Sequence, residues 1–122
     1  MPVLYAFRGE VLELRAIGSY APTEVATAFH LALADPARPR LRALLYDVRE
    51  SLEVRTRSTP DVRAAVAFFS TLAKEVGQRA ALLVSTDVAY GVMRMVAGWA
   101  EGSGIDVEVF RDPDEAYAWA SR

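Results

Sequence analysis

The stretch Leu-Arg-Ala-Leu-Leu-Tyr-Asp-Val, residues 41–48, decides the fold because it is a nearly continuous apolar run. A strand with one face in water alternates apolar and polar side chains, whereas a strand covered on both faces is apolar almost throughout. The run Ala-Ala-Leu-Leu-Val at 80–84 has the same character. Both segments are therefore predicted to be central strands of a covered sheet. The residues expected in the core of these strands are Leu44, Leu45, Leu82, Leu83 and Val84.

Shorter strands are predicted on either side of this pair. Residues 3–7 are apolar and β-prone, and residues 11–16 alternate apolar and polar side chains. Arg8-Gly9-Glu10 between them suits a tight turn, so the two segments are expected to form a hairpin. A fifth strand is predicted at 106–110.

Four helices are predicted between and after the strands, from apolar residues at helical spacing. Proline suits the first turn of a helix, and three of the predicted helices begin with one, at Pro22, Pro60 and Pro113. Glycine suits the end of a helix, and Gly77 stands at the end of the second one. The element order β, β, α, β, α, β, α, β, α implies right-handed crossovers between parallel strands, apart from the hairpin. We therefore predict one α/β domain over residues 1–122, with a five-stranded mixed, mostly parallel sheet and about four helices. The second and third helices are expected over 60–76 and roughly 88–101.

The composition is that of a globular protein, with 122 residues, 52% hydrophobic and 25% charged. The absence of cysteine excludes disulfides, thiolate metal sites and cysteine nucleophiles, and the single histidine, His30, cannot form a histidine metal cluster. His30 is expected on the solvated side of the first helix. Fourteen basic against sixteen acidic residues give a net charge of −2, which provides no global attraction to nucleic acid or to an anionic membrane. No cofactor, no metal and no nucleic-acid partner are therefore expected.

The ends and apolar runs of the chain bear on its location. Met1-Pro2-Val3 lacks the basic segment and following apolar core of a signal peptide. The longest apolar runs are too short to cross a bilayer. We therefore expect a cytoplasmic protein without a transmembrane segment.

Three stretches make the chain resemble a known family. They are LLYDVRES at 44–51, YGVMRM at 90–95 and VEVFRDPDEAYAWA at 107–120. Together with the element order, they are similar to the sporulation anti-sigma-factor-antagonist-like proteins, relatives of the STAS domain (sulphate transporter and anti-sigma factor antagonist). The resemblance covers nearly the whole chain and implies a STAS-like fold and a regulatory module with a protein partner. None of the three stretches is a catalytic signature.

The resemblance also implies a candidate switch. In anti-sigma antagonists a hydroxyl at the start of the helix after the central strand is phosphorylated, and that helix is expected here near Ser58 and Thr59. A phosphate there would lie at the positive end of a helix, where Arg55 and Arg57 could pair with it. The alternative is a helix cap, because Ser58 and Asp61 have capping-box spacing. The aspartate-serine-small-glycine pattern usual in those proteins is absent, and the connection is longer.

Asp47 and Arg49 form a second candidate site, at the predicted end of the first central strand. Open α/β sheets bind ligands at the carboxyl ends of their strands. Residues two apart in a strand lie on the same side, so this acid and base could flank a ligand or an interface together. The alternative is a structural pair that satisfies amides of the following loop.

The third candidate is the helix predicted over 88–101, which is apolar around much of its circumference. Such a helix is either deeply buried or covered by a partner. Gly91 and Gly98 share a face and cost about 1 kcal/mol each relative to alanine, which suggests the close approach of another helix, a ligand or the sheet. One apolar stripe comprises Val88, Val92, Met95, Val96 and Trp99, and a second comprises Tyr90, Met93, Ala97 and Ala100.

A homodimer is predicted through the second stripe, because the sheet can cover only one of the two. Its centre would be Met93, Ala97 and Tyr90. Arg94 would lie at the rim, one turn from Tyr90 and able to stack on it.

Two functions are compatible with these candidates. We prefer a non-enzymatic regulatory or protein-interaction module that presents residues 49–63 to a protein partner, since the sequence has no nucleophile-elbow or phosphate-cradling motif. The alternative is a protein that binds a lipid or another small apolar ligand in a pocket between the sheet and the helix at 88–101.

Overall fold

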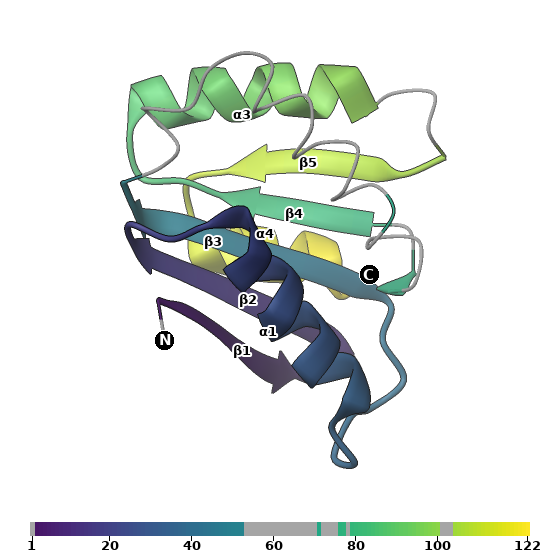
Figure 1. Cartoon of the computed structure of the whole chain (residues 1–122). Helices are drawn as coiled ribbons and strands as arrows, with labels where there is room; N and C mark the ends of the chain where they lie inside the picture. Colours follow the sequence, from purple (N-terminus) through teal and green to yellow (C-terminus); the bar gives the residue numbers. More distant parts are fainter. Residues whose placement is uncertain (1, 53–70, 72–75, 78, 101–103) are drawn as a thin grey trace.

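The five strands form a single sheet in the order β1-β2-β3-β4-β5 (Figure 1). The computed structural model describes residues 2–52, 71, 76–77, 79–100 and 104–122. The helix predicted over 60–76 therefore falls, apart from residues 71 and 76, outside the described residues. The strands are β1 (Val3–Arg8), β2 (Val11–Gly18), β3 (Ala43–Ser51), β4 (Arg79–Leu83) and β5 (Asp106–Phe110), and the helices are α1 (Pro22–Ala34), α3 (Asp87–Ala100) and α4 (Pro113–Ala120).

The sheet has the predicted mixture of strand directions. β1 and β2 form the expected antiparallel hairpin, with Arg8 opposite Val11. The turn contains Gly9, whose φ of 58° is left-handed and favours glycine. β2, β3, β4 and β5 run parallel to one another, so the prediction of a mixed, mostly parallel sheet is confirmed.

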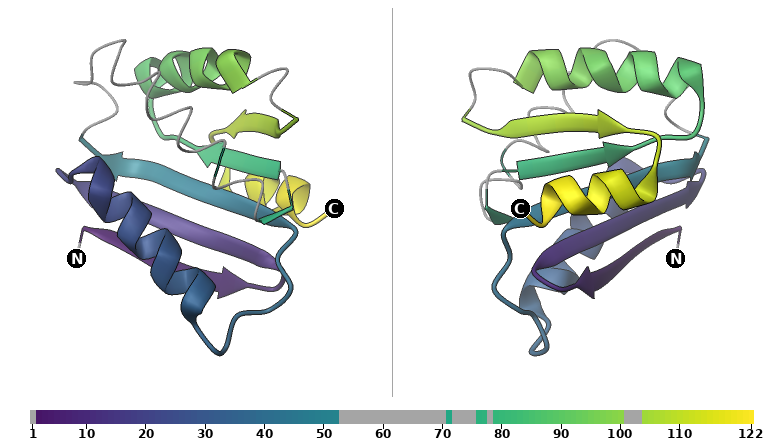
Figure 2. Two further views of the ribbon diagram at one scale, coloured as in Figure 1. Left: turned by 45° about the vertical axis from the view of Figure 1, so that its right-hand side comes forward. Right: turned by 180° about the vertical axis from the view of Figure 1, so that it is seen from behind.

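Helices cover both faces of the sheet. α1 crosses one face in front of β1 and β2, and α4 lies on the opposite face, where it comes forward when the molecule is seen from behind (Figures 1 and 2). α3 runs alongside β5 at one side of the sheet, and its inner side chains join the same core cluster as those of α1. Helices on both faces are what a parallel sheet requires. None of the described helices is both long and apolar enough to cross a membrane.

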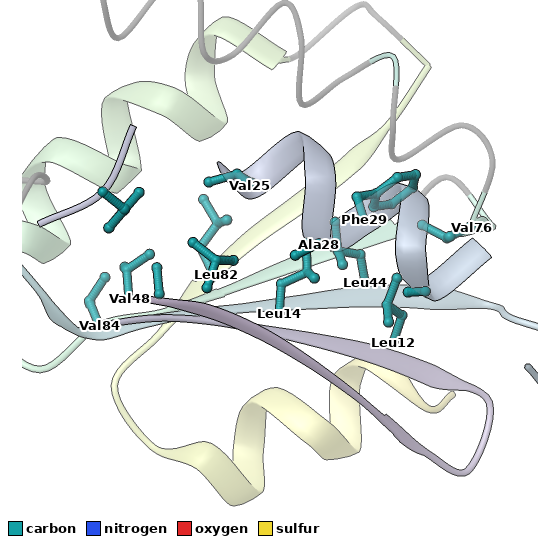
Figure 3. Close-up of a cluster of buried hydrophobic side chains, with 14 of the residues drawn as sticks. Leu12, Leu14, Val25, Ala28, Phe29, Leu44, Val48, Val76, Leu82 and Val84 are labelled. Atoms are coloured by element: carbon teal, nitrogen blue, oxygen red, sulfur yellow. The ribbon is translucent and has the colours of Figure 1, made fainter. Parts of the chain in front are cut away.

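The core explains why the central strands are apolar on both sides. Alternate residues of β3 and β4 point to opposite faces, toward α1 on one side and toward α4 on the other. Figure 3 shows Phe29 of α1 pointing toward the sheet, where Leu14 of β2 and Leu44 of β3 lie. All five residues predicted for the core are fully or almost fully buried, which confirms the prediction: Leu44, Leu45, Leu82, Leu83 and Val84.

β3 is longer than predicted, because it continues beyond Val48 to Ser51 where a connection was expected. Its polar end remains paired with β2, with Gly18 opposite Ser51. Across these strands Arg15 Nε donates to Glu50 Oε2 at 2.9 Å. A cross-strand ion pair therefore accommodates charged residues that a buried strand would exclude.

Gly77 lies where two backbone segments approach closely. Its φ is 89°, a left-handed value that favours glycine. A Cβ at this position would lie 2.0 Å from the carbonyl oxygen of Arg42, the residue before β3. Val76 beside it is fully buried in the cluster that also contains Phe29.

Candidate functional site

Strand ends and helix starts meet at one side of the sheet, which we call the carboxyl edge. We define it as residues 18–20, 47–52, 84–90 and 110–111. Within it, the Leu52 N–H donates to the Gly18 carbonyl at 2.9 Å, and Ser85 Oγ donates to the Arg49 carbonyl at 3.1 Å. α1 and α3 both begin at this edge, so the positive ends of two helix dipoles point toward it.

Asp47 and Arg49 form an ion pair with each other. Arg49 Nε donates to Asp47 Oδ1 at 3.0 Å, the terminal NH2 group donates to Oδ2 at 2.9 Å, and the Arg49 backbone N–H donates to Oδ1 at 3.0 Å. The Asp47 side chain is 12% exposed and that of Arg49 is 38% exposed. Hydrogen bonding to Asp47 raises the pKa of Arg49, which favours the charged pair. This geometry matches the alternative in which Asp47 and Arg49 form a structural pair with each other. Part of the Arg49 guanidinium still faces solvent.

A cluster of hydroxyl groups at the same edge was missed by the sequence analysis. The Tyr20 hydroxyl lies 2.8 Å from Ser51 Oγ and 3.4 Å from the Tyr46 hydroxyl. Tyr20 and Ser51 are buried, and buried hydroxyls require hydrogen-bond partners. The cluster ties the loop after β2 to the end of β3. Tyr20 lies more than twenty residues before both Tyr46 and Ser51 in sequence, so no local pattern indicates its contacts with them.

The start of α3 adds a second guanidinium to the carboxyl edge. Thr86 caps the helix, because its Oγ1 accepts from the Ala89 N–H at 3.1 Å. Arg111, just after β5, places NH1 2.7 Å from Asp87 Oδ1 and lies with its guanidinium 4.3 Å from the centre of the Tyr90 ring. The sequence indicated that Arg94 could stack on Tyr90, but the cation–π contact described for this ring is with Arg111. Arg111 takes its place because the end of β5 lies beside the first turn of α3.

The two predicted apolar stripes of α3 do not divide into an inner and an outer face, because Val92 of the first stripe packs against the core cluster. Tyr90, Met93 and Ala97 are half-buried and pack against the core cluster of the same chain. This packing argues against these residues as the centre of the predicted dimer, and the homodimer itself stays a prediction. Val88 and Met95 point outward instead, with 59% and 48% of their surface exposed.

The two glycines of α3 do not mark a close approach within the described chain. Gly91 and Gly98 are exposed, and no described heavy atom lies within 4 Å of a Cβ built at either position. Of the three alternatives, a close approach of the sheet is therefore not found among the described residues, and the other two, another helix or a ligand, stay open. Arg94 is exposed beside them.

The candidate switch residues and His30 remain to be placed. Arg55, Arg57, Ser58 and Thr59 lie outside the described residues, so the switch remains a prediction. His30 is exposed on α1, as expected. Among the residues that the structure describes, no three acidic or histidine side chains are grouped as metal ligands.

The carboxyl edge is equipped for binding. Two guanidinium groups, those of Arg49 and Arg111, are each anchored by a carboxylate and remain partly exposed. Anchored guanidinium groups recognise carboxylates, phosphates and backbone carbonyls.

Comparisons with known proteins identify the fold. No protein-family model matches the sequence, and no curated protein gives a significant match. One similar solved structure is an uncharacterised protein of the DUF3478 family with a SpoIIAA-like fold from Shewanella loihica PV-4, with a TM-score of 0.61, 14% identity, and coverage of 97% of this chain and 91% of that one. Another is an anti-sigma factor antagonist from Mycobacterium paratuberculosis, with a TM-score of 0.65, 14% identity, and coverage of 98% and 93%. The predicted STAS-like fold is confirmed.

Proposed function

We propose that this chain is a non-enzymatic regulatory module that binds a protein partner through its carboxyl edge. The observation that supports the proposal is the likeness of its fold to an anti-sigma factor antagonist over 98% of the chain. A fold hosts many functions, so the binding residues must come from the site itself. The proposal includes action in the cytoplasm.

Arg111 is the residue of this edge best suited to a protein contact. It is held by Asp87 and by the ring of Tyr90, yet 51% of its side chain is exposed. A side chain that is already ordered loses little conformational entropy on binding. Arginine and tyrosine are also enriched among the residues that dominate the energy of interfaces. Arg49, anchored by Asp47, offers a second contact of the same kind.

The edge continues along the chain into the candidate switch. Leu52 is exposed at the end of β3, and residues 53–59 follow it directly in sequence. We include Ser58 and Thr59 in the proposal as phosphate acceptors, with Arg55 and Arg57 as contacts to the partner. A phosphate would add negative charge beside a partner-binding surface rich in arginine, which would change its affinity.

The alternative, a pocket for a lipid or small apolar ligand between the sheet and α3, has less support. Val92, Met93 and Ala97 on the inner face of α3 pack against the core cluster. Their side chains lie in the space where such a ligand would have to bind.

The proposal can be tested with two matched substitutions, Arg111→Ala and Arg8→Ala. Arg8 lies at the opposite side of the sheet and, like Arg111, contacts one carboxylate and one tyrosine ring, although its ion pair is longer. Its side chain is 51% exposed, its NH1 lies 3.9 Å from a carboxylate oxygen of Glu13, and its guanidinium lies 3.9 Å from the centre of the Tyr117 ring. Both variants therefore lose one exposed ion pair and one cation–π contact, and should be equally stable.

The wild type and both variants would be used as immobilised bait in a lysate of the source cells, and retained proteins identified by mass spectrometry. Calorimetry with the purified partner would then give dissociation constants. We expect a partner that is retained by the wild type and Arg8→Ala, and a dissociation constant raised about 30-fold by Arg111→Ala. A partner that Arg8→Ala releases and Arg111→Ala retains would contradict the proposed edge, and a wild type that retains no protein would contradict the proposed function.

A further inference from the structure

The outward face of α3 is apolar and has no partner within the described part of the chain. We call Val88, Gly91, Met95 and Gly98 the outer stripe. Val88 and Met95 are among the most exposed large apolar residues, and both glycines border open space as far as the described atoms extend. Interior glycines weaken a helix relative to alanine. Packing within the described chain does not explain why two of them stand here, beside exposed apolar side chains.

The spacing within the outer stripe is complementary to itself. Two copies of a helix can pack antiparallel about a two-fold axis. A residue of one copy then lies opposite a residue of the other copy whenever their two sequence numbers add up to one fixed total. The pair Val88 and Gly98 has the same sum as the pair Gly91 and Met95. In that register each large side chain of one copy faces a glycine of the other. A glycine leaves room for the opposing side chain and lets the helices approach closely.

We infer that α3 pairs antiparallel with α3 of a second copy of this chain, with Val88 facing Gly98 and Met95 facing Gly91 across the two-fold axis. A second copy of α3 can pack in this way only if each large residue is matched by a glycine of the same helix. A partner with a different sequence would not require this match. The inference does not rest on the proposed function. The outer stripe shares only Val88 with the carboxyl edge and otherwise runs along the outward side of α3.

The pairing should be weak and reversible. α3 has 14 residues and is about 21 Å long, so one helix pair buries less than the roughly 1,200 Å² of a typical stable complex. Arg94 borders the outer stripe and would approach its own symmetry copy at the rim, where like charges limit the affinity. We expect a dissociation constant on the order of 10–100 µM.

The oligomeric state tests the inference through three variants. Met95→Glu puts an unpaired carboxylate in the interface, and Gly91→Leu fills the gap that Met95 of the other copy would occupy. Leu31→Glu is the matched control, because Leu31 lies on α1 and has the same 48% exposure as Met95. Sedimentation equilibrium should give a wild-type dimer, the same dimer for Leu31→Glu, and a dissociation constant raised about 100-fold or more for Met95→Glu and Gly91→Leu. Gly91→Leu should melt no lower than the wild type in dilute solution, since leucine favours a helix over glycine.

Disulfide trapping tests the register, because the chain contains no cysteine of its own. A mixture of Gly91→Cys and Met95→Cys should form the mixed disulfide faster than either variant forms its own.

Three results would overturn the inference. A wild type that is monomeric into the millimolar range would do so, even if the outer stripe then bound a different protein or a lipid surface. Equal weakening by Leu31→Glu would show a general charge effect and no specific interface. Faster disulfide formation by Gly91→Cys alone than in the mixture would exclude the register.

Discussion

Replacement of Gly77 by alanine should be one of the most destabilising single substitutions in this chain. The new Cβ would lie 2.0 Å from the Arg42 carbonyl oxygen, 2.4 Å from the carbonyl carbon and 2.7 Å from Cα. These are backbone atoms, so no side-chain rotation relieves the clash. One of the two backbone segments must therefore move by about an ångström or more to restore van der Waals distances.

The size of the destabilisation follows from the hydrogen bonds that Arg42 makes. Its N–H donates to the Glu10 carbonyl at 2.9 Å, its Nε to Glu10 Oε2 at 2.7 Å, and its NH1 to the Ser121 carbonyl at 3.0 Å. Each hydrogen bond contributes about 1 kcal/mol, and a left-handed alanine costs about 1–2 kcal/mol more. The expected loss is at least about 4 kcal/mol, which corresponds to roughly 15 °C in Tm for a chain of this length.

Alanine substitutions at two other glycines provide controls for which the direction of the change in stability can be stated in advance. Gly18 also has a left-handed φ, 65°, but no described atom lies within 4 Å of its Cβ position, so Gly18→Ala should cost only about 1–2 kcal/mol. Gly91 is helical and borders open space, so Gly91→Ala should stabilise the dilute protein by about 0.5–1 kcal/mol. Urea denaturation followed by circular dichroism measures all three. If Gly77→Ala costs no more than Gly18→Ala, the described contact between Gly77 and Arg42 is incorrect.

Three further predictions concern the core and the pH dependence. Leu83→Ala should lower the free energy of unfolding by about 2–5 kcal/mol in urea denaturation, because Leu83 is almost fully buried, and a loss below about 1 kcal/mol would contradict the core. Met93→Glu should unfold the chain, since Met93 packs against the core, and a native circular dichroism spectrum in dilute solution would contradict that packing. Hydrogen bonds from the Ala37 N–H and then from the Tyr5 hydroxyl lower the pKa of Asp35. Their contribution is present above the ordinary carboxyl pKa of 3.8 and is lost as the pH falls through the lowered value, so Tyr5→Phe should be less sensitive to acid than the wild type. Identical acid-unfolding curves would argue against this contact.

The fold could be predicted because apolar periodicity reports burial directly. Leu44 and Leu45 point to opposite faces of the sheet, and both faces are covered, so a continuous apolar run identifies a central strand. The end of β3 was missed because Arg49, Glu50 and Ser51 lack this pattern. Glu50 and Ser51 remain in the strand through pairing with β2, and Glu50 also through its ion pair with Arg15, contacts that depend on tertiary structure. Arg49 is held by its local ion pair with Asp47.

The candidate site could be predicted only in part. Asp47 and Arg49 were found because residues two apart in a strand share a side, which is a local property. The contact between Tyr20 and Ser51 and the stacking of Arg111 on Tyr90 join residues far apart in sequence, and no local pattern indicates them.

The orientation of α3 could not be derived from its sequence. Both of its stripes are apolar, so hydrophobicity alone did not distinguish the face that contains Met93 from the face that contains Met95. The two glycines were interpreted as a close approach of another helix, a ligand or the sheet, and the sequence did not decide among these; among the described residues they border open space. A helix with a single apolar stripe would have permitted the correct assignment.

Amide chemical shifts of the isotope-labelled protein, recorded while its purified partner is added, would test the central claim most directly. If the carboxyl edge binds the partner, the largest changes should occur at the amides of Ser51, Leu52, Ser85, Tyr90 and Arg111. Amides at the opposite side of the sheet, such as those of Gly9, Arg42 and Arg79, should change little. Changes concentrated on that opposite side, with the carboxyl edge unaffected, would contradict the account.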